Sequence, residues 1–153
     1  MTKGEERRCF TLGVFQDTDW AERGLEALKR RGFAPTSLSI LAQHRPEVAA
    51  LVERSLGVQT TPVDISGLGA AVASGSLVGA LQGGDEALAK IGIAASIRRA
   101  GFQAHDGFIF ETLTARGGIL VGIESEALAA DALTVLHAYG GGNAAIGAWA
   151  GRV

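Results

Sequence analysis

The sequence contains a single cysteine, Cys9, which excludes a framework of disulfides within the chain. A chain of 153 residues does not need one, because it is long enough for one domain with a sizeable hydrophobic core. The opening residues, MTKGEERRC, are charged and no apolar run follows them, so the pattern of a secretory signal is missing. We therefore expect a single domain over residues 1–153 and a cytoplasmic location.

The sequence also lacks a dominant charge. Its 14 Lys and Arg residues stand against 16 Asp and Glu residues, which is not the balance of a strongly basic nucleic-acid-binding protein. Proline occurs three times and 47% of the residues are hydrophobic, unlike a disordered chain. Glycine, in contrast, occurs 22 times, about twice its ordinary usage. We expect a folded protein with no nucleic-acid partner, in which the glycines serve close packing and helix ends.

The first 43 residues carry the pattern of a strand, a helix and a second strand. Residues 9–16 (CFTLGVFQ) are rich in β-branched and aromatic side chains, which favours a strand. Asp19 and Glu22 have the spacing of a capping box, and Gly32 is a typical stop, so a helix is predicted between them. Residues 37–43 (SLSILAQ) predict the second strand.

The centre of the chain predicts short, interrupted helices, and its end repeats the pattern of its beginning. Pro46 and Gly57 bracket one helix, residues 59–65 read as a connector, and Gly92 and Gly101 break later helices. The remaining predicted elements are helices over 85–90, 93–100, 106–116 and 126–139 and strands over 118–124 and 143–150.

The two ends of the chain resemble each other internally. Leu12-Gly13-Val14 matches Val121-Gly122-Ile123, and the helices that follow align as well. Two strand–helix–strand units predict an α+β fold, the ferredoxin-like βαββαβ sandwich. In this scheme residues 9–43 and 118–153 form the two halves, and residues 44–117 form a helical, Gly/Ala-rich insertion between the second and third strands.

One face of such a sheet is left without helices. Because side chains alternate along a strand, we expect that face to be apolar and to be covered by the insertion or by a partner subunit. The residues assigned to it are Thr11, Gly13, Phe15, Leu41, Leu120, Gly122 and Trp149.

Residues 66–84 (SGLGAAVASGSLVGALQGG) carry no charge and have small residues four apart. Read as one helix, this spacing aligns them in a strip for helix packing or an interface. Gly67 and Gly69 also begin a GxGxxG pattern, but Val72 occupies the third position. The uncharged run from Ile65 to Gly84 has the length of a membrane span and is only weakly hydrophobic, so membrane contact is an alternative. The strip comprises Gly67, Ala71, Gly75, Gly79 and Gly83.

Three stretches carry a resemblance to a known family: LGVFQDTDWAERGLEALKRRGF, GLGAAVASGSLVGAL, and TARGGILVGIES with the following LAADALTVLHAYG. In this order they resemble a bacterial family of heat-induced general stress protein domains. The resemblance implies a small stress-associated protein without an established reaction, and it supplies no catalytic residues.

No convergent catalytic constellation is visible in the sequence, so we expect no catalytic residues, no metal and no cofactor. The histidines are isolated, and Cys9 reads as an inert strand residue. Lys29, Arg30 and Arg31 suit the end of a helix, although phosphate contact is open. The residues that suit a ligand site between sheet and insertion are His105, Asp106, Tyr139 and Trp149.

Three functions remain open at this point. The first is a non-enzymatic homo-oligomer that acts through assembly or partner binding. The second is a small-ligand sensor that uses the four residues just named. The third, an enzyme of the dimeric α/β barrel type, requires polar or histidine side chains on the sheet, and the predicted strands offer almost none.

Overall fold

A computed structural model describes residues 7–82, 86–99, 104–124, 134, 135, 138 and 147–152. For residues 7–10, 80, 87, 99, 104–107 and 147–152 it describes the backbone alone. The elements, in chain order, are β1 (Arg7–Phe15), α1 (Thr18–Arg30), a 3-10 turn η2 (Pro35–Ser37), β2 (Leu38–Gln43), α2 (Pro46–Leu56), β3 (Thr61–Ile65), β4 (Gly69–Ser74), α3 (Ser76–Gln82), α4 (Ala87–Arg99), α5 (Ala104–Ala115), β5 (Ile119–Glu124) and β6 (Gly147–Arg152).

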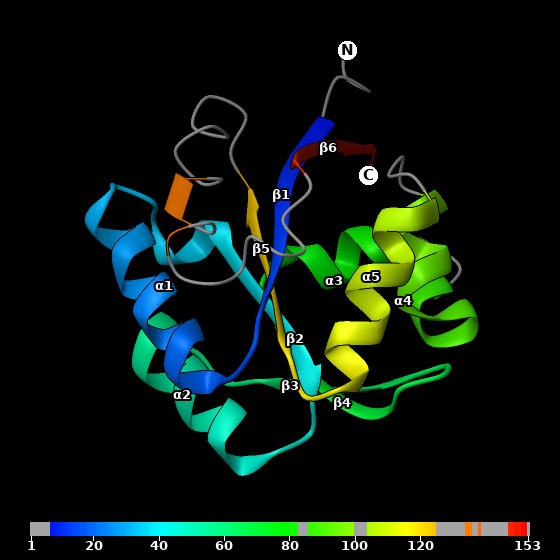
Figure 1. Ribbon diagram of the computed structural model, residues 1–153, viewed down its shortest axis with the longest axis horizontal. Coiled ribbons are helices and arrows are strands. Elements are labelled where there is room, and N and C mark those ends of the chain that lie inside the picture. The colour runs from blue at the N-terminus through cyan, green and yellow to red at the C-terminus, as the bar shows by residue number, and fades with distance from the viewer. Residues whose placement is uncertain are drawn as a thin grey trace.

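The strands form one sheet in the order β3-β4-β2-β5-β1-β6, and every neighbouring pair is antiparallel. Figure 1 shows α1 and α2 on one side of this sheet and α3, α4 and α5 on the other. The chain is therefore a mixed α+β fold, as the sequence predicts. Of the predicted helix over residues 126–139, the structure describes only Thr134, Val135 and Ala138, which are helical.

Helices α1 and α2 cover the first face because each has one apolar side. In α1 the buried positions recur every three or four residues and include Ala21, Leu25 and Leu28, the spacing of one helical face. Helix α2 begins with Pro46 at its first position and ends at Gly57, whose φ of 71° is left-handed. Both helices pack on a core that includes Ile40, Ile119, Val121 and Ile123 from the sheet.

Helices α3, α4 and α5 cover the opposite face of the sheet. Leu77, Leu81, Leu88, Ile93, Ile97 and Phe110 are all fully or almost fully buried there. They pack against Leu12, Val14, Leu41 and Leu120 from the strands. The apolar second face expected from the sequence is thus covered by residues 76–115 of the same chain.

The prediction placed the side chains of β1 on the wrong faces. Leu12 and Val14 face α3–α5, whereas Phe15 belongs to the core under α1 and α2. The register accounts for this, because Val14 lies opposite Leu120 and Phe15 opposite Ile119. The ring of Phe15 also fills the space beside Gly24 of α1, where a Cβ atom would overlap it. The internal repeat matches Leu12 with Val121, yet these two side chains lie on opposite faces of the sheet.

The glycine-rich stretch is not one helix, and this prediction was wrong. Gly69–Ser74 form β4, and only Ser76–Gln82 form a helix. Gly67, Gly69 and Gly75 have φ values of 85°, 88° and 91°, a left-handed backbone that interrupts a right-handed helix. The small residues Gly67, Ala71, Gly75 and Gly79 therefore lie in a turn, a strand, a bend and a helix rather than in one strip, and Gly83 lies outside the described residues.

The insertion also contributes strands, contrary to the all-helical prediction. Residues 61–65, read from the sequence as part of a connector, form β3, which pairs with β4 and extends the sheet beyond β2. β3 is an edge strand, and Thr61, Pro62 and Asp64 on it are exposed. Within the described residues, no helix combines the length and the apolar character that crossing a bilayer requires.

The break predicted at Gly92 is confirmed. Helix α4 is interrupted there by a φ of 89°. A Cβ atom at this position would lie 2.7 Å from the carbonyl oxygen of Ser66, so the β3–β4 turn approaches the break too closely for a side chain. The carboxylate of Glu111 accepts a hydrogen bond from the Ala94 amide at 3.1 Å and satisfies an amide just after the break.

Candidate functional site

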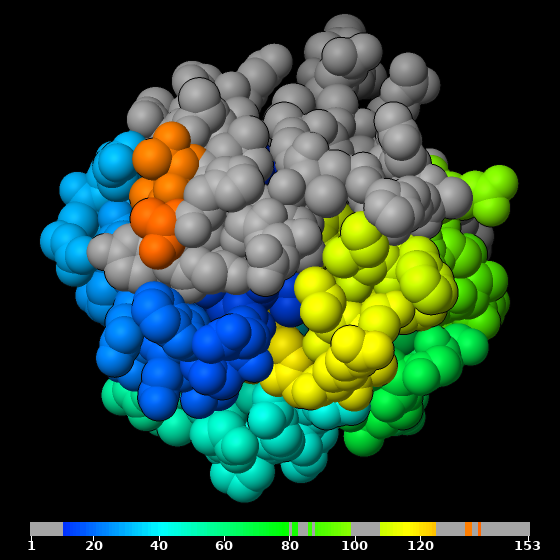
Figure 2. All heavy atoms as spheres, viewed as in Figure 1, coloured from blue at the N-terminus to red at the C-terminus, as the bar shows by residue number. Residues whose placement is uncertain are grey.

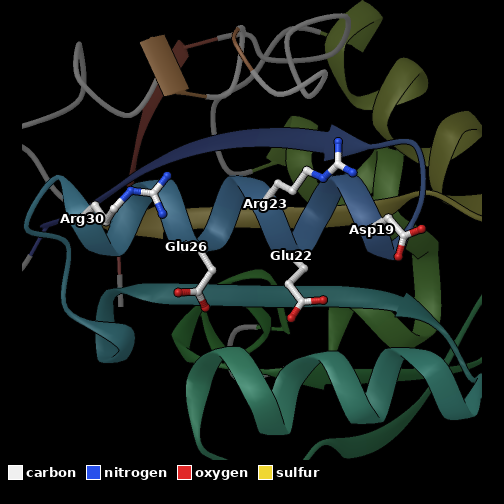
Figure 3. Close-up of a pocket in the computed structure, with 5 residues that line it drawn as sticks. All are labelled: Asp19, Glu22, Arg23, Glu26 and Arg30. Atoms are coloured by element: carbon white, nitrogen blue, oxygen red, sulfur yellow. The ribbon is translucent and has the colours of Figure 1, made fainter.

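The outer face of α1 forms an open groove of about 440 Å³, lined by Asp19, Glu22, Arg23, Glu26 and Arg30. Figure 3 shows these five side chains along the helix, on the side away from the sheet. We refer to this surface as the α1 groove. In the space-filling view the first part of α1 lies at the surface, next to α2 (Figure 2).

The beginning of α1 fixes the orientation of this face. The Asp17 carboxylate accepts a hydrogen bond from the Trp20 amide at 2.8 Å and caps the helix. The predicted capping box of Asp19 and Glu22 is wrong, because the helix begins at Thr18 and both residues already lie inside it. Because Ala21, Gly24, Leu25 and Leu28 point into the core, the charged residues between them point outward.

The side of the groove nearer α2 carries carboxylates held by cations of the same layer. Arg54 of α2 donates two hydrogen bonds to Glu22, at 3.0 and 3.2 Å. These bonds lower the pKa of the Glu22 carboxyl, and slight burial opposes them. Lys29 lies 2.9 Å from Glu26 and also donates to the Ser55 carbonyl at 2.9 Å. These contacts fix both the acidic side chains and the spacing of α1 and α2.

The other side of the groove carries two arginines. In Figure 3, Arg23 extends to the side opposite Glu22 and Glu26, and the Arg30 side chain runs along the helix. The Arg23 guanidinium lies 4.9 Å from the ring centroid of Trp20, in cation–π geometry. Neither Arg23 nor Arg30 forms an ion pair with any residue that the structure describes.

Together these residues form two parallel rows of opposite charge on one exposed helix. Including the partners Lys29 and Arg54, the groove brings four cations and three carboxylates together. In protein interfaces, complementary charge patterns of this kind orient the partners and select among them. The described part of the chain contains no group of three or more His, Cys, Asp or Glu residues suited to hold a metal ion.

The four residues proposed from the sequence as a ligand site are only partly placed. His105 and Asp106 lie in the first turn of α5, and Trp149 lies on β6 opposite Phe10, but their side chains are outside the described residues. Tyr139 is outside them altogether. Whether these side chains converge therefore stays a prediction.

Sequence reasoning missed most of the α1 groove. The apolar spacing of the helix marks Trp20 only as an apolar position and does not mark Arg23, although a Trp and an Arg three residues apart in a helix are neighbours. That spacing was the available signal. The pair of Glu22 and Arg54, in contrast, joins residues 32 positions apart and carries no local signal.

Comparison with known proteins adds no relative. No family model, no curated protein and no solved structure matches this chain. The functional argument therefore depends on the geometry of the described residues.

Proposed function

We propose that this chain is a non-enzymatic, stress-associated protein that acts by assembly, and that it forms a homo-oligomer through the α1 groove. The observation that carries the proposal is the pair of opposite charged rows beside the half-buried Trp20. Arg and Trp are enriched among the residues that dominate protein interfaces. The stress association rests on the sequence resemblance, and assembly rests on this surface.

A second copy of the chain supplies the complement that the groove requires. A two-fold axis parallel to α1 turns one helix face onto its copy without reversing the helix direction. The arginine row of each copy then faces the acidic row of the other, as an isologous interface requires. A two-fold axis perpendicular to the helix and lying in the plane of the interface would instead place arginine on arginine.

The charges set the geometry of this interface more than its strength. Exposed ion pairs contribute about 0.2–1 kcal/mol each. The acidic row also keeps its cations Lys29 and Arg54, so pairing with a second copy extends existing pairs into networks. Covering the Trp20 ring supplies the apolar contact.

Sedimentation velocity tests the proposal, with the full chain measured over a range of concentrations. We expect self-association in dilute buffer that weakens in about 1 M salt, where charges are screened beyond about 3 Å. The double variant Arg23→Glu/Arg30→Glu should remain monomeric under conditions in which the wild type associates. A wild type that stays monomeric at the highest concentration contradicts the proposal.

The matched control is Arg98→Glu/Arg116→Glu, which changes the net charge equally. Both arginines are exposed, on α4 and just after α5, away from the groove. We expect this variant to associate like the wild type. Equal loss of association in both double variants would show that net charge, rather than the α1 groove, governs self-association.

We further propose that β1, α1, β2, β5 and β6 belong to a ferredoxin-like βαββαβ core into which α2 to α5 are inserted. The order β2-β5-β1-β6 with antiparallel neighbours supports this, since it is the order of that fold with the insertion removed. An experimentally determined structure tests it at residues 126–139. A helix packed beside α1 is expected, and any other course of these residues contradicts the proposal.

A further inference from the structure

A small apolar pocket lies where the start of β2, the end of β4 and the end of α2 meet. Its volume is about 220 Å³. It shares no residue with the α1 groove, so it is a separate site. Among the described residues that line it none is charged; they are Pro35, Thr36, Leu38, Leu56, Val58, Ser74 and Gly75.

Two of the described lining residues carry hydroxyl side chains, the exposed Thr36 and the buried Ser74, which is the last residue of β4. Ser74 lies opposite Ile40 in the sheet and on the same side as Val72, facing the α2 layer. It is only 8% exposed, and its hydroxyl has no hydrogen-bond partner among the residues that the structure describes. A buried hydroxyl without a partner is unfavourable, and of the hydroxyls in this state Ser74 is one that lines a pocket, where a ligand atom can pair with it.

The backbone beside the pocket is held rigidly. Gly75 has a φ of 91°, and a Cβ atom there would lie 2.7 Å from the Leu38 carbonyl oxygen. Directly beyond it, the Ser39 hydroxyl accepts a hydrogen bond from the Leu77 amide at 3.0 Å. These contacts fix the end of β4 against β2, and a pocket that is already formed loses little entropy when a ligand binds.

We infer that this pocket binds a small, uncharged, mainly apolar molecule that carries one hydroxyl or carbonyl group. A cavity of about 150 Å³ lined by apolar side chains accommodates benzene, so a volume of this size accommodates a single ring with one polar substituent. The polar atom of the ligand pairs with the Ser74 hydroxyl, whose staggered rotamers allow it to turn toward the pocket. The remaining lining residues contact the ring.

Phenol is the probe that tests this inference. Its binding to the full chain is followed by amide chemical shifts and by calorimetry, with benzene as a ligand of the same shape without a hydroxyl. We expect shifts centred on residues 35–38, 56–58 and 74–75. Ser74→Ala should weaken phenol binding about fivefold, the order of one hydrogen bond, and leave benzene binding unchanged.

Two further variants keep the test independent of folding. Ser96→Ala removes a hydroxyl that is also buried and without a partner, but on α4, so phenol should bind this variant like the wild type. Val58→Phe places a larger side chain at a lining position that is 46% exposed and should abolish binding of both ligands. Shifts centred elsewhere, no binding of phenol, or equal phenol affinity in the wild type and Ser74→Ala would each overturn the inference.

Discussion

The two helical layers cover opposite faces of the same sheet by different means. Helices α1 and α2 are continuous, and side chains join them to each other: Arg54 to Glu22, and Lys29 to the Ser55 carbonyl. In the other layer α3 has seven residues and α4 is broken at Gly92. In that layer side chains accept hydrogen bonds from backbone amides: Gln82 of α3 accepts from the Ala89 amide, and Glu111 of α5 accepts from the Ala94 amide. The Ser66 amide also donates to the Ala89 carbonyl and ties α4 to the β3–β4 turn.

Both layers nevertheless bury most of their large apolar residues against the sheet, although Ile91 and Phe108 of the second layer are 47% and 63% exposed. Phe15 under α1 and Phe110 in α5 are each 0% exposed. The difference teaches that short helices can cover a sheet when glycine breaks allow the chain to turn and when hydrogen bonds satisfy the backbone amides beside the breaks. Substitutions that reduce the volume of a core side chain should therefore destabilise both layers. Substitutions of glycines with a positive φ should destabilise mainly the second layer.

The largest effect tests whether the two layers are equally well packed. Phe15→Ala and Phe110→Ala should each lower the free energy of unfolding by about 3–5 kcal/mol, because each leaves a cavity in a dense core. Chemical denaturation measures both values. A loss for Phe110→Ala that is well below that for Phe15→Ala would break the comparison, since it would mean that the broken layer is loosely attached.

The next effect concerns glycine conformation. Gly75→Ala should lower the free energy of unfolding by about 3 kcal/mol, because left-handed strain is combined with a collision against the backbone of β2. Gly32→Ala is the matched control, since its φ is 100° and nothing lies within 4 Å of an added Cβ atom. Strain alone predicts a loss of about 1 kcal/mol there. Equal losses would show that close approach adds nothing to the strain.

The smallest effect concerns the ion pair that joins α1 to α2. Arg54 lowers the pKa of Glu22, so the pair stabilises the fold above the ordinary carboxyl value of 4.5 and loses this contribution as the pH falls through the lower, folded-state pKa. Because the pair is largely exposed, Glu22→Gln should cost less than about 1 kcal/mol at neutral pH. Chemical denaturation of the wild type and of Glu22→Gln as a function of pH measures the difference in their free energies of unfolding. This difference should vanish in acid. A difference that does not change with pH would exclude the charge of Glu22 as its source.

The two layers also differ in how well they could be predicted from sequence. Helix α1 was found because its apolar spacing, its polar start and its glycine stop agree with one another. The prediction of one helix over the glycine-rich stretch failed because small residues four apart also fit a strand and a turn. The sequence does not reveal which glycines adopt a positive φ. The assignment of the β1 side chains to the two faces of the sheet failed because Leu12, Val14 and Phe15 are all apolar. The strand therefore shows no alternation of polar and apolar residues that would tell its two faces apart.

The candidate sites were less predictable than the fold. The α1 groove depends on Arg54, which only tertiary packing brings to Glu22. The Ser74 pocket depends on the ends of β2, β4 and α2, and no spacing in the sequence connects them. Sites that form where separate elements meet leave no periodic pattern, whereas the helices that frame them do.

The edge strand β3 has a consequence for the behaviour of the protein at high concentration. An exposed strand edge is a template on which identical chains add to one another and grow into insoluble fibres. Pro62 has no amide hydrogen to donate to an incoming strand, and the charge of the exposed Asp64 repels its counterpart on another copy. Both features should therefore keep copies of the chain from adding to one another at this edge.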